Sequence, residues 1–335
     1  MMICGLTLFA ALQGPQDEPI RVVTTLGVLK YVAEQVGGSR VQATALAPAG
    51  QDPHYIVPTP DLQRRAAEAK LFVQVGRGLE LWAKNVIDGS GNTKIAPGQP
   101  GHVWASSSCP LLELPKELSR EWGDIHPEGN PHVWLDPLSV RIMAANVCEA
   151  LCKVDPAGAE TYLKNLEAFE RRVADALYGR ELVEAVGWKK IGILDRRLKG
   201  GELDEYLKDR SLTDKLGGWL GKARPLKGAK VISYHKTYIY FAKRFGLDIV
   251  AELEERPGIP PTAAHRDQVV ELTKRHGVKA ILNDNFYPRG AADYVARETG
   301  AKVVVAHIDV GAAEEVSDYF KLIDRLLDPL IEALK

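Results

Sequence analysis

Three of the eight histidines stand where an imidazole could bind a metal ion. His54 lies in AGQDPHYIVPTP, His132 in EGNPHVWLDP and His235 in VISYHKTYIYF. Proline directly precedes His54 and His132 and restricts the backbone there, which favours a preorganised ligand. Neutral imidazole is a common metal ligand. Because the three residues are far apart in the sequence, they form one site only if the fold brings them together, and the pattern alone leaves this open.

Four of the other histidines have ordinary structural explanations. His276 precedes Gly277 at a predicted helix end, where a positive charge interacts favourably with the helix dipole. The other three lie in polar loops or at a strand end: His102, His265 and His307. No HExxH zinc motif, nucleophile triad or glycine-rich phosphate loop accompanies them. The sequence therefore lacks the common hydrolase signatures.

Two stretches of the chain repeat one order of predicted elements. Residues 20–75 and residues 229–285 each predict strand, helix, strand, proline-containing loop, helix and strand. The strands are short runs rich in Val and Ile, which is typical of parallel strands buried on both faces. We therefore expect two α/β lobes, each with a parallel sheet flanked by helices. Ligands bind at the carboxyl ends of such strands, where His54 and His235 both fall.

A long helix is expected between the lobes. Apolar residues recur at three- and four-residue steps from Tyr162 to Leu177, and the stretch 156–186 contains glycine only at Gly158 and Gly179. A continuous helix of this length would span about 45 Å and act as a stiff connection. Residues 195–229 are charged and glycine-containing, which predicts a solvated excursion from the surface.

Length and composition agree with this organisation. A chain of 335 residues predicts two domains at roughly 100–200 residues each. Lys and Arg (43) balance Asp and Glu (44) to a net charge of −1, without the basic excess of a nucleic-acid-binding protein. No apolar stretch approaches the roughly 20 residues of a membrane span. We expect an N-terminal lobe at 20–140, a linking long-helix region at 141–187 and a C-terminal lobe at 188–335.

The N-terminus favours export. The apolar run MMICGLTLFAAL has the length of a signal-peptide core, although the first basic residue is Arg21. Residues 1–19 are therefore expected to be a signal peptide or a disordered N-terminus, and a buried strand is the alternative. Export would place the protein in the periplasm or elsewhere outside the cytoplasm.

The cysteines do not identify a function. Cys148 and Cys152 are spaced to share one helix face, where two core-facing thiols are commoner than a soft-metal site. Removal of a leader containing Cys4 would leave them with Cys109, and an odd number argues against a pure disulfide framework.

Four segments together resemble the zinc and manganese receptors of ABC importers. They are DPHYIVPTPDLQRRAAEAKLFVQVGRGLELW, NPHVWLDP, SYHKTYIYFAKRFGL and ETGAKVVV. The similarity runs from about Ile20 to the C-terminus with the motifs in the same order, and the first two are highly specific together. The resemblance implies an α/β fold of two lobes, each with a parallel sheet flanked by helices, joined by one long backbone helix.

The resemblance also implies a set of metal ligands, two from each lobe. It assigns His54 and His132 to the N-terminal lobe and His235 to the C-terminal lobe. The fourth ligand is normally a carboxylate late in the chain. Asp309 in VVVAHIDVG occupies the closest position and is preferred, and Asp284 in ILNDNF is the alternative.

This sequence departs from the family pattern in two places. Zinc receptors often carry a loop rich in His and acidic residues between the two N-lobe ligands, whereas here that region holds only His102 and His126. His126 could assist capture or replace a ligand, but an ordinary loop residue is the favoured interpretation. The charged insertion at 195–229 has no evident role.

The implied function is metal transport rather than catalysis. Three imidazoles and one carboxylate suit tetrahedral Zn²⁺, whereas Mn²⁺, the alternative ion, prefers more oxygen ligands. The resemblance implies a monomeric receptor outside the cytoplasmic membrane that carries Zn²⁺ to the permease and ATPase subunits of an ABC importer. The alternative function is a zinc-dependent hydrolase with water at an open coordination position.

Overall fold

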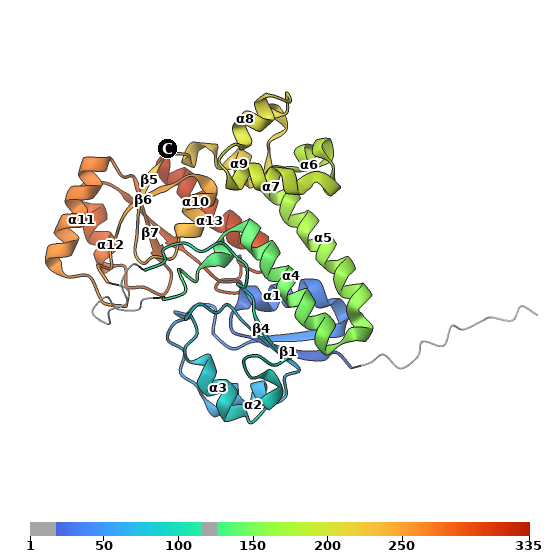
Figure 1. Cartoon of the computed structure of the whole chain (residues 1–335). Helices are drawn as coiled ribbons and strands as arrows, with labels where there is room; N and C mark the ends of the chain where they lie inside the picture. Colours follow the sequence, from blue (N-terminus) through green and yellow to red (C-terminus); the bar gives the residue numbers. More distant parts are fainter. Residues whose placement is uncertain (1–17, 116–125, 257) are drawn as a thin grey trace, which may run out of the picture.

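The computed structural model describes residues 18–115, 126–256 and 258–335. The export signal expected at 1–19 therefore lies outside the described residues except for its last two. Two lobes follow one another along the chain, with the N-terminal lobe below the C-terminal lobe in Figure 1. Among the helices of the described part, none combines the length and apolar character of a membrane crossing.

The N-terminal lobe is built on a four-stranded parallel sheet in the order β2-β1-β3-β4. Its strands are β1 (Ile20–Thr24), β2 (Val41–Ala45), β3 (Leu71–Gln74) and β4 (His102–Trp104). Its helices are α1 (Gly27–Gly37), α2 (Pro60–Ala67), α3 (Ala83–Ser90) and α4 (Pro137–Val154). Strand β3 is buried along its whole length, as expected for a strand covered on both faces.

The C-terminal lobe repeats this architecture. Its parallel sheet has the order β6-β5-β7-β8, which matches the order of the first sheet strand for strand. The strands are β5 (Lys230–Ser233), β6 (Asp248–Glu252), β7 (Ala280–Asp284) and β8 (Lys302–Ala306). The helices are α10 (Ile239–Phe245), α11 (Ala263–His276), α12 (Gly290–Thr299) and α13 (Tyr319–Leu334). The predicted fold of two parallel α/β lobes is confirmed.

Two threonines begin equivalent helices in the two lobes. Thr59 precedes α2 and Thr262 precedes α11, and each side-chain oxygen accepts a hydrogen bond from the backbone N–H three residues later. This contact satisfies an amide that the first helical turn leaves without a partner. The local sequence therefore sets the start of both helices, at the end of the loop that follows the second strand of each lobe.

The connection between the lobes is shorter than the expected continuous helix. Helix α5 (Ala159–Tyr178) ends at Gly179, which has φ of +88°, and α6 (Arg180–Val186) then takes a new direction. Gly179 also lies against the backbone of Gly217, so close that a Cβ would be 2.8 Å from the Gly217 Cα. Both requirements favour glycine. Helix α5 spans about 30 Å and packs along α1 and α4.

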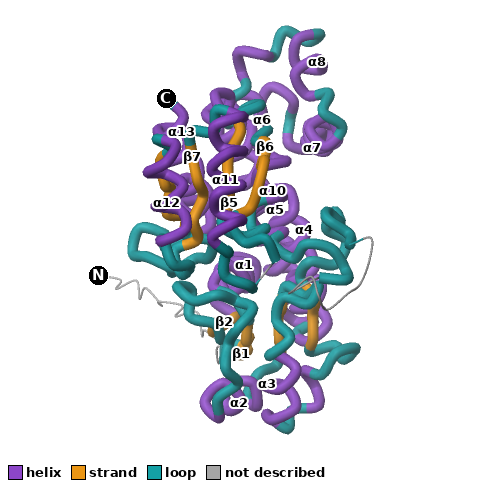
Figure 2. Tube along the Cα trace, turned by 90° about the vertical axis from the view of Figure 1, so that its left-hand side faces the viewer, coloured by secondary structure: helices purple, strands orange, loops and turns teal. Residues whose placement is uncertain are grey.

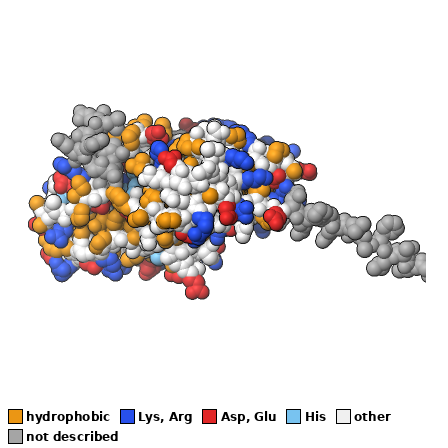
Figure 3. Space-filling view, turned by 90° about the horizontal axis from the view of Figure 1, so that it is seen from below, with side chains coloured by type: hydrophobic (Ala, Val, Ile, Leu, Met, Phe, Trp, Pro, Cys, Tyr) orange, Lys and Arg blue, Asp and Glu red, His pale blue; other side chains and the backbone are white. Residues whose placement is uncertain are grey.

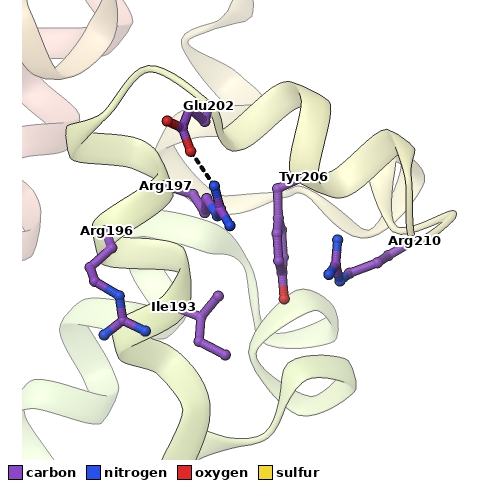
Figure 4. A pocket seen from close by; sticks show the side chains of 6 residues that line it. All are labelled: Ile193, Arg196, Arg197, Glu202, Tyr206 and Arg210. Carbon is purple, nitrogen blue, oxygen red and sulfur yellow. Dashed lines mark hydrogen bonds and ion pairs between the residues drawn. The ribbon is translucent and has the colours of Figure 1, made fainter.

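The charged insertion forms short helices at the far end of α5 (Figures 1 and 2). They are α7 (Ile191–Lys199), α8 (Leu203–Lys208) and α9 (Gly218–Lys222). Leu203, Leu207 and Trp219 are buried and belong to the same apolar core as the rest of the chain, and Trp219 packs against Tyr319 of α13. A surface pocket of about 470 Å³ lies between α7 and α8. Figure 4 shows the Tyr206 ring in this pocket between the guanidinium groups of Arg197 and Arg210.

The underside of the molecule carries exposed apolar side chains. Figure 3 shows hydrophobic side chains gathered toward the left of this face, with charged side chains around them. In the N-terminal lobe, four exposed apolar residues line a cavity of about 960 Å³: Leu81, Trp104, Leu111 and Leu114. The three cysteines of the described residues, Cys109, Cys148 and Cys152, carry free thiols.

Candidate metal centre

The fold brings the three predicted histidines together between the lobes. His54 lies in the loop after β2, His132 lies just before α4, and His235 follows β5 directly. One ring nitrogen from each lies within 4.8 Å of the others. The ring centroids are 5.3–5.4 Å apart in all three pairs. Two strand ends and one helix start thus converge on a single point, and the predicted clustering is present in the structure.

These imidazoles are shielded from solvent. The side chains of His54 and His235 are 7% and 5% exposed, and His132 is buried. Among the described residues, they form the one group of His, Cys, Asp and Glu side chains whose geometry fits a metal ion. Three buried imidazoles that face one point are a donor set for a divalent cation such as Zn²⁺.

His54 and His132 are held by the same local motif. In Asp52-Pro53-His54 and in Asn130-Pro131-His132, a side-chain oxygen accepts hydrogen bonds from both the backbone N–H and the ring Nδ1 of the histidine two residues later. The ring contacts are 2.7 Å and 3.0 Å long. With the proton on Nδ1, each ring presents the lone pair of Nε2 to the centre. Such partners fix the orientation of metal-binding histidines.

His235 is oriented by a carboxylate from the next strand. Its Nδ1 lies 2.8 Å from Oε2 of Glu254, which follows β6 and is itself buried. Its Nε2 is buried and makes no hydrogen bond. A buried ring nitrogen without a partner is energetically costly, and a metal ion bound there would remove the cost.

A fourth histidine, His126, lies beside this cluster and contacts His54, although the geometric group of possible ligands does not include it. Its Nε2 is 3.2 Å from Nε2 of His54, and the two ring centroids are 5.2 Å apart. Its ring makes a hydrogen bond to the backbone of Arg77. The sequence favoured an ordinary loop role for His126, six residues before His132, with a role in capture or as a substitute ligand as the alternative.

The structure does not place Asp309 among the histidines. Its carboxylate accepts hydrogen bonds from the backbone N–H groups of Gly27 (2.8 Å) and Val28 (2.7 Å), at the start of α1. Its own neighbour Val310 donates a third, at 2.9 Å. A negative charge at a helix N-terminus is stabilised by the helix dipole. Asp309 therefore joins the C-terminal lobe to the N-terminal lobe through α1.

The close approach at this contact depends on glycine at position 27. A Cβ on Gly27 would lie 2.1 Å from the carbonyl oxygen of Val310, a distance that no folded chain tolerates. Burial raises the pKa of Asp309 to about 7, against the lowering effect of the three backbone hydrogen bonds. Glycine at position 27 therefore allows the start of α1 to approach closely enough to donate its backbone N–H groups to Asp309.

The alternative carboxylate, Asp284, is also engaged by neighbouring groups. It ends β7, is fully buried, and accepts hydrogen bonds from the hydroxyl groups of Tyr238 and Thr237. Burial raises its pKa to about 7, and the charge of nearby His235 acts in the opposite direction. Asp284 therefore lies near the centre, but the geometric group of possible ligands does not include it.

A cavity between the lobes leads to the polar residues around the histidines. It has a volume of about 710 Å³, and its walls include Asp52 from the N-terminal lobe with Glu254 and Tyr287 from the C-terminal lobe. The Tyr287 hydroxyl donates a hydrogen bond to Asp52 across the lobes, at 3.1 Å. The carboxylates that orient His54 and His235 thus line a cavity through which a cation can approach.

A buried ion pair holds the lobes together beside the site. Arg244 in α10 donates two hydrogen bonds to the carboxylate of Asp136, at 2.6 Å and 3.0 Å. Asp136 also caps α4 by accepting a hydrogen bond from the Leu138 N–H. The side chains of Arg244 and Asp136 are 9% and 4% exposed. This pair fixes the start of α4, four residues after His132, against the C-terminal lobe.

The sequence matches the model of one protein family over most of its length. That family is described as zinc-uptake complex component A, periplasmic, and the match covers residues 22–177 and 214–333. The unmatched stretch between them includes α6, α7 and α8. The chain is 24% identical over 339 residues to the high-affinity zinc uptake system protein ZnuA of Bacillus subtilis, covering 99% of this chain and 92% of the relative.

A manganese-binding relative is about equally similar. The manganese-binding lipoprotein MntA of Halalkalibacterium halodurans is 23% identical over 310 residues, with 90% of this chain and 85% of the relative covered. A crystal structure of ZnuA superimposes with a TM-score of 0.68 at 19% identity, covering 95% of this chain and all of the other, which supports the same fold. On the strength of the family match, the chain belongs to the zinc-uptake complex component A family of metal-binding transport receptors.

Proposed function

We propose that this protein captures Zn²⁺ outside the cytoplasmic membrane and delivers it to the permease and ATPase subunits of an ABC importer. The observation that carries the proposal is the convergence of His54, His132 and His235 from both lobes on one buried point. The family membership supports a receptor in metal uptake. Relatives are named as metal-binding transport proteins rather than enzymes, so the hydrolase alternative is set aside.

The donor atoms favour zinc over manganese. The three histidines offer nitrogen, and imidazole suits Zn²⁺ in a tetrahedral site, whereas Mn²⁺ favours carboxylate, carbonyl and water oxygen. Relatives of both kinds exist, so similarity alone does not choose between the ions. The choice of zinc rests on the nitrogen donors of this chain.

The arrangement of the ligands allows the ion to be bound tightly and still be released to the transporter. Ligands come from both lobes, so the ion joins them only while the N-lobe imidazoles and His235 stay close together. Separation of the lobes on the transporter would remove at least one ligand from the ion and weaken binding. The N-terminal signal expected at 1–19 would export the chain. We take the exported protein to act as a monomer. Its two lobes would comprise residues 20–140 and 188–335, linked through residues 141–187.

Zinc affinity is expected to fall as the pH falls, because protons compete with the metal for imidazole. Burial lowers the pKa of His126 to about 3 and the pKa of His132 well below its ordinary value, so both rings are neutral at pH 7. Burial also acts to lower the pKa of His235, but the hydrogen bond and charge of Glu254 outweigh it and raise that pKa. Protons therefore compete with zinc at His235 more strongly than burial alone would allow.

Calorimetric titration with ZnCl₂ tests the pH dependence of zinc affinity. The buffers should run from about pH 7.5 to about pH 5, a range that includes the ordinary histidine pKa of about 6.5. The proposal predicts a steady loss of affinity toward acid. Where His235 carries a proton, zinc binding releases it, and this release is seen as a heat that depends on the ionisation enthalpy of the buffer. An affinity that stays flat across this range would exclude His235 as a ligand, and with it the site formed between the two lobes.

A further inference from the structure

We propose that His126 is the fourth ligand of the bound ion, so that four imidazole nitrogens hold it. This inference rests on the proposed function, since it completes the same site. It assigns the fourth position to a residue that comes from the same loop region as His132. Three ligands would then come from the N-terminal lobe and one, His235, from the C-terminal lobe.

The distance between His126 and His54 fits two ligands of a tetrahedral zinc ion. Two nitrogens bound to zinc at about 2.0–2.1 Å with tetrahedral angles lie about 3.3 Å apart. The Nε2 atoms of His126 and His54 are 3.2 Å apart. His126 also faces His132, with ring centroids at 6.4 Å. The pair of His54 and His126 thus already has the spacing of one edge of the coordination tetrahedron.

The Nε2 atoms of the two rings lie opposite each other. Nδ1 of His54 faces the carboxylate of Asp52, and Nδ1 of His126 lies beside Gly78, 3.5 Å from where a Cβ would be. The ring of His126 also bonds to the backbone of Arg77. If Nδ1 of each neutral ring carries the proton, both Nε2 atoms present lone pairs. Without a metal, the 3.2 Å distance is that of a hydrogen bond in which one Nε2 donates to the other, and a metal ion that replaces this proton would be bound by both rings.

The carboxylates that could compete for the fourth position have other partners. Both oxygens of Asp309 accept backbone N–H groups of α1, and releasing them would leave the start of α1 unsatisfied. Both oxygens of Asp284 accept hydroxyl groups. His126 would give up only the contact between its Nε2 and that of His54, and a shared metal ion would replace this contact, although the ring is not yet within the mutual distance that His54, His132 and His235 share.

Four neutral imidazoles leave the positive charge of the ion to be balanced from outside the ligand set. The carboxylates of Asp52 and Glu254 supply the balancing negative charge. They are hydrogen-bonded to the rings of His54 and His235. An all-nitrogen set with balancing carboxylates behind it suits Zn²⁺, and it offers Mn²⁺ none of the oxygen ligands that it prefers. The site is therefore expected to discriminate against manganese through its ligand atoms.

The test is X-ray absorption at the zinc edge on the zinc-loaded full chain, because scattering from imidazole rings counts the bound histidines. The wild-type protein is expected to show four imidazoles, and His126→Ala three. Asp309→Asn should keep four, because Asp309 is assigned to α1. His276→Ala, which removes a histidine at the end of α11, serves as the matched control and should also keep four.

Zinc affinity gives an independent reading on the same variants. Loss of groups that support a metal ligand typically costs 10–100-fold in affinity, so His126→Ala is expected to bind zinc about tenfold more weakly or worse. Manganese affinity should change little. Three imidazoles in both wild type and His126→Ala, or loss of an oxygen ligand in Asp309→Asn, would overturn the inference while leaving the receptor function intact. A wild-type chain that binds no zinc would overturn both.

Discussion

The His132→Ala variant is expected to bind zinc more weakly than the wild type by roughly 10–100-fold or more, since even residues that only support a ligand cost that much. His132 is the most buried of the three histidines, and its Nε2 faces the centre because Asn130 holds Nδ1. Alanine leaves a space that water fills only as a weaker ligand. Competition titration against a zinc chelator of known affinity measures the change.

The same titration on His54→Ala and His235→Ala completes the test. Each removes one nitrogen of the cluster, so each should weaken binding by a similar factor. His276→Ala should bind zinc like the wild type, because that ring lies at the end of α11 and bonds to Lys230. Unchanged affinity in any two of the three cluster variants would mean that the histidines do not form the binding site.

The Arg244→Ala variant is expected to lose about 3–5 kcal/mol of unfolding free energy, the usual cost of removing one partner from a buried ion pair. The reason is that Asp136 would remain buried with its negative charge uncompensated. The same change frees the start of α4 from the C-terminal lobe, so zinc affinity should fall as well. Urea unfolding followed by circular dichroism, on the metal-free proteins, measures the stability change.

A second arginine substitution serves as the control, because it removes a positive charge without breaking a buried ion pair. Arg275 lies exposed in the last turn of α11, and Arg275→Ala should change stability by no more than about 0.5 kcal/mol. If Arg244→Ala proved as mild as Arg275→Ala, the pair between α10 and α4 would not be what joins the lobes at this point.

The fold could be predicted from the sequence because its signals are local. Runs of Val and Ile such as Ile20–Thr24 and Lys230–Ser233 are long enough for one buried strand and are followed by helix patterns at a fixed interval. The repeat of this order predicted two parallel sheets, and both have the same strand order. The extent of α5 was predicted less well, because the close backbone contact between Gly179 and Gly217 depends on packing.

The site was predictable in part. His54 and His235 follow strands whose carboxyl ends face the space between the lobes, which the element pattern indicated. The orienting residues Asp52 and Asn130 were not singled out, although both stand two residues before a histidine with proline between. That repeated spacing is a sequence signal that could have identified them.

The contacts of Asp309 and His126 were not predictable in the same way. The sequence places Asp309 after a strand, but only the docking of the two lobes decides that the backbone N–H groups of Gly27 and Val28 take its oxygens. The position of His126 likewise depends on its contacts with residues 77–78, which are far from it in the chain. Contacts between segments far apart in the chain are not visible in local patterns.

The central claim is that the histidine cluster binds one zinc ion, and native mass spectrometry with elemental analysis tests it most directly. The comparison is between the wild-type chain and a variant that combines His54→Ala, His132→Ala and His235→Ala, after exposure of both to equal zinc and manganese. The account predicts one zinc per wild-type chain and none retained by the folded triple variant. A wild-type chain that carries no zinc, or a triple variant that retains it equally, would contradict the account.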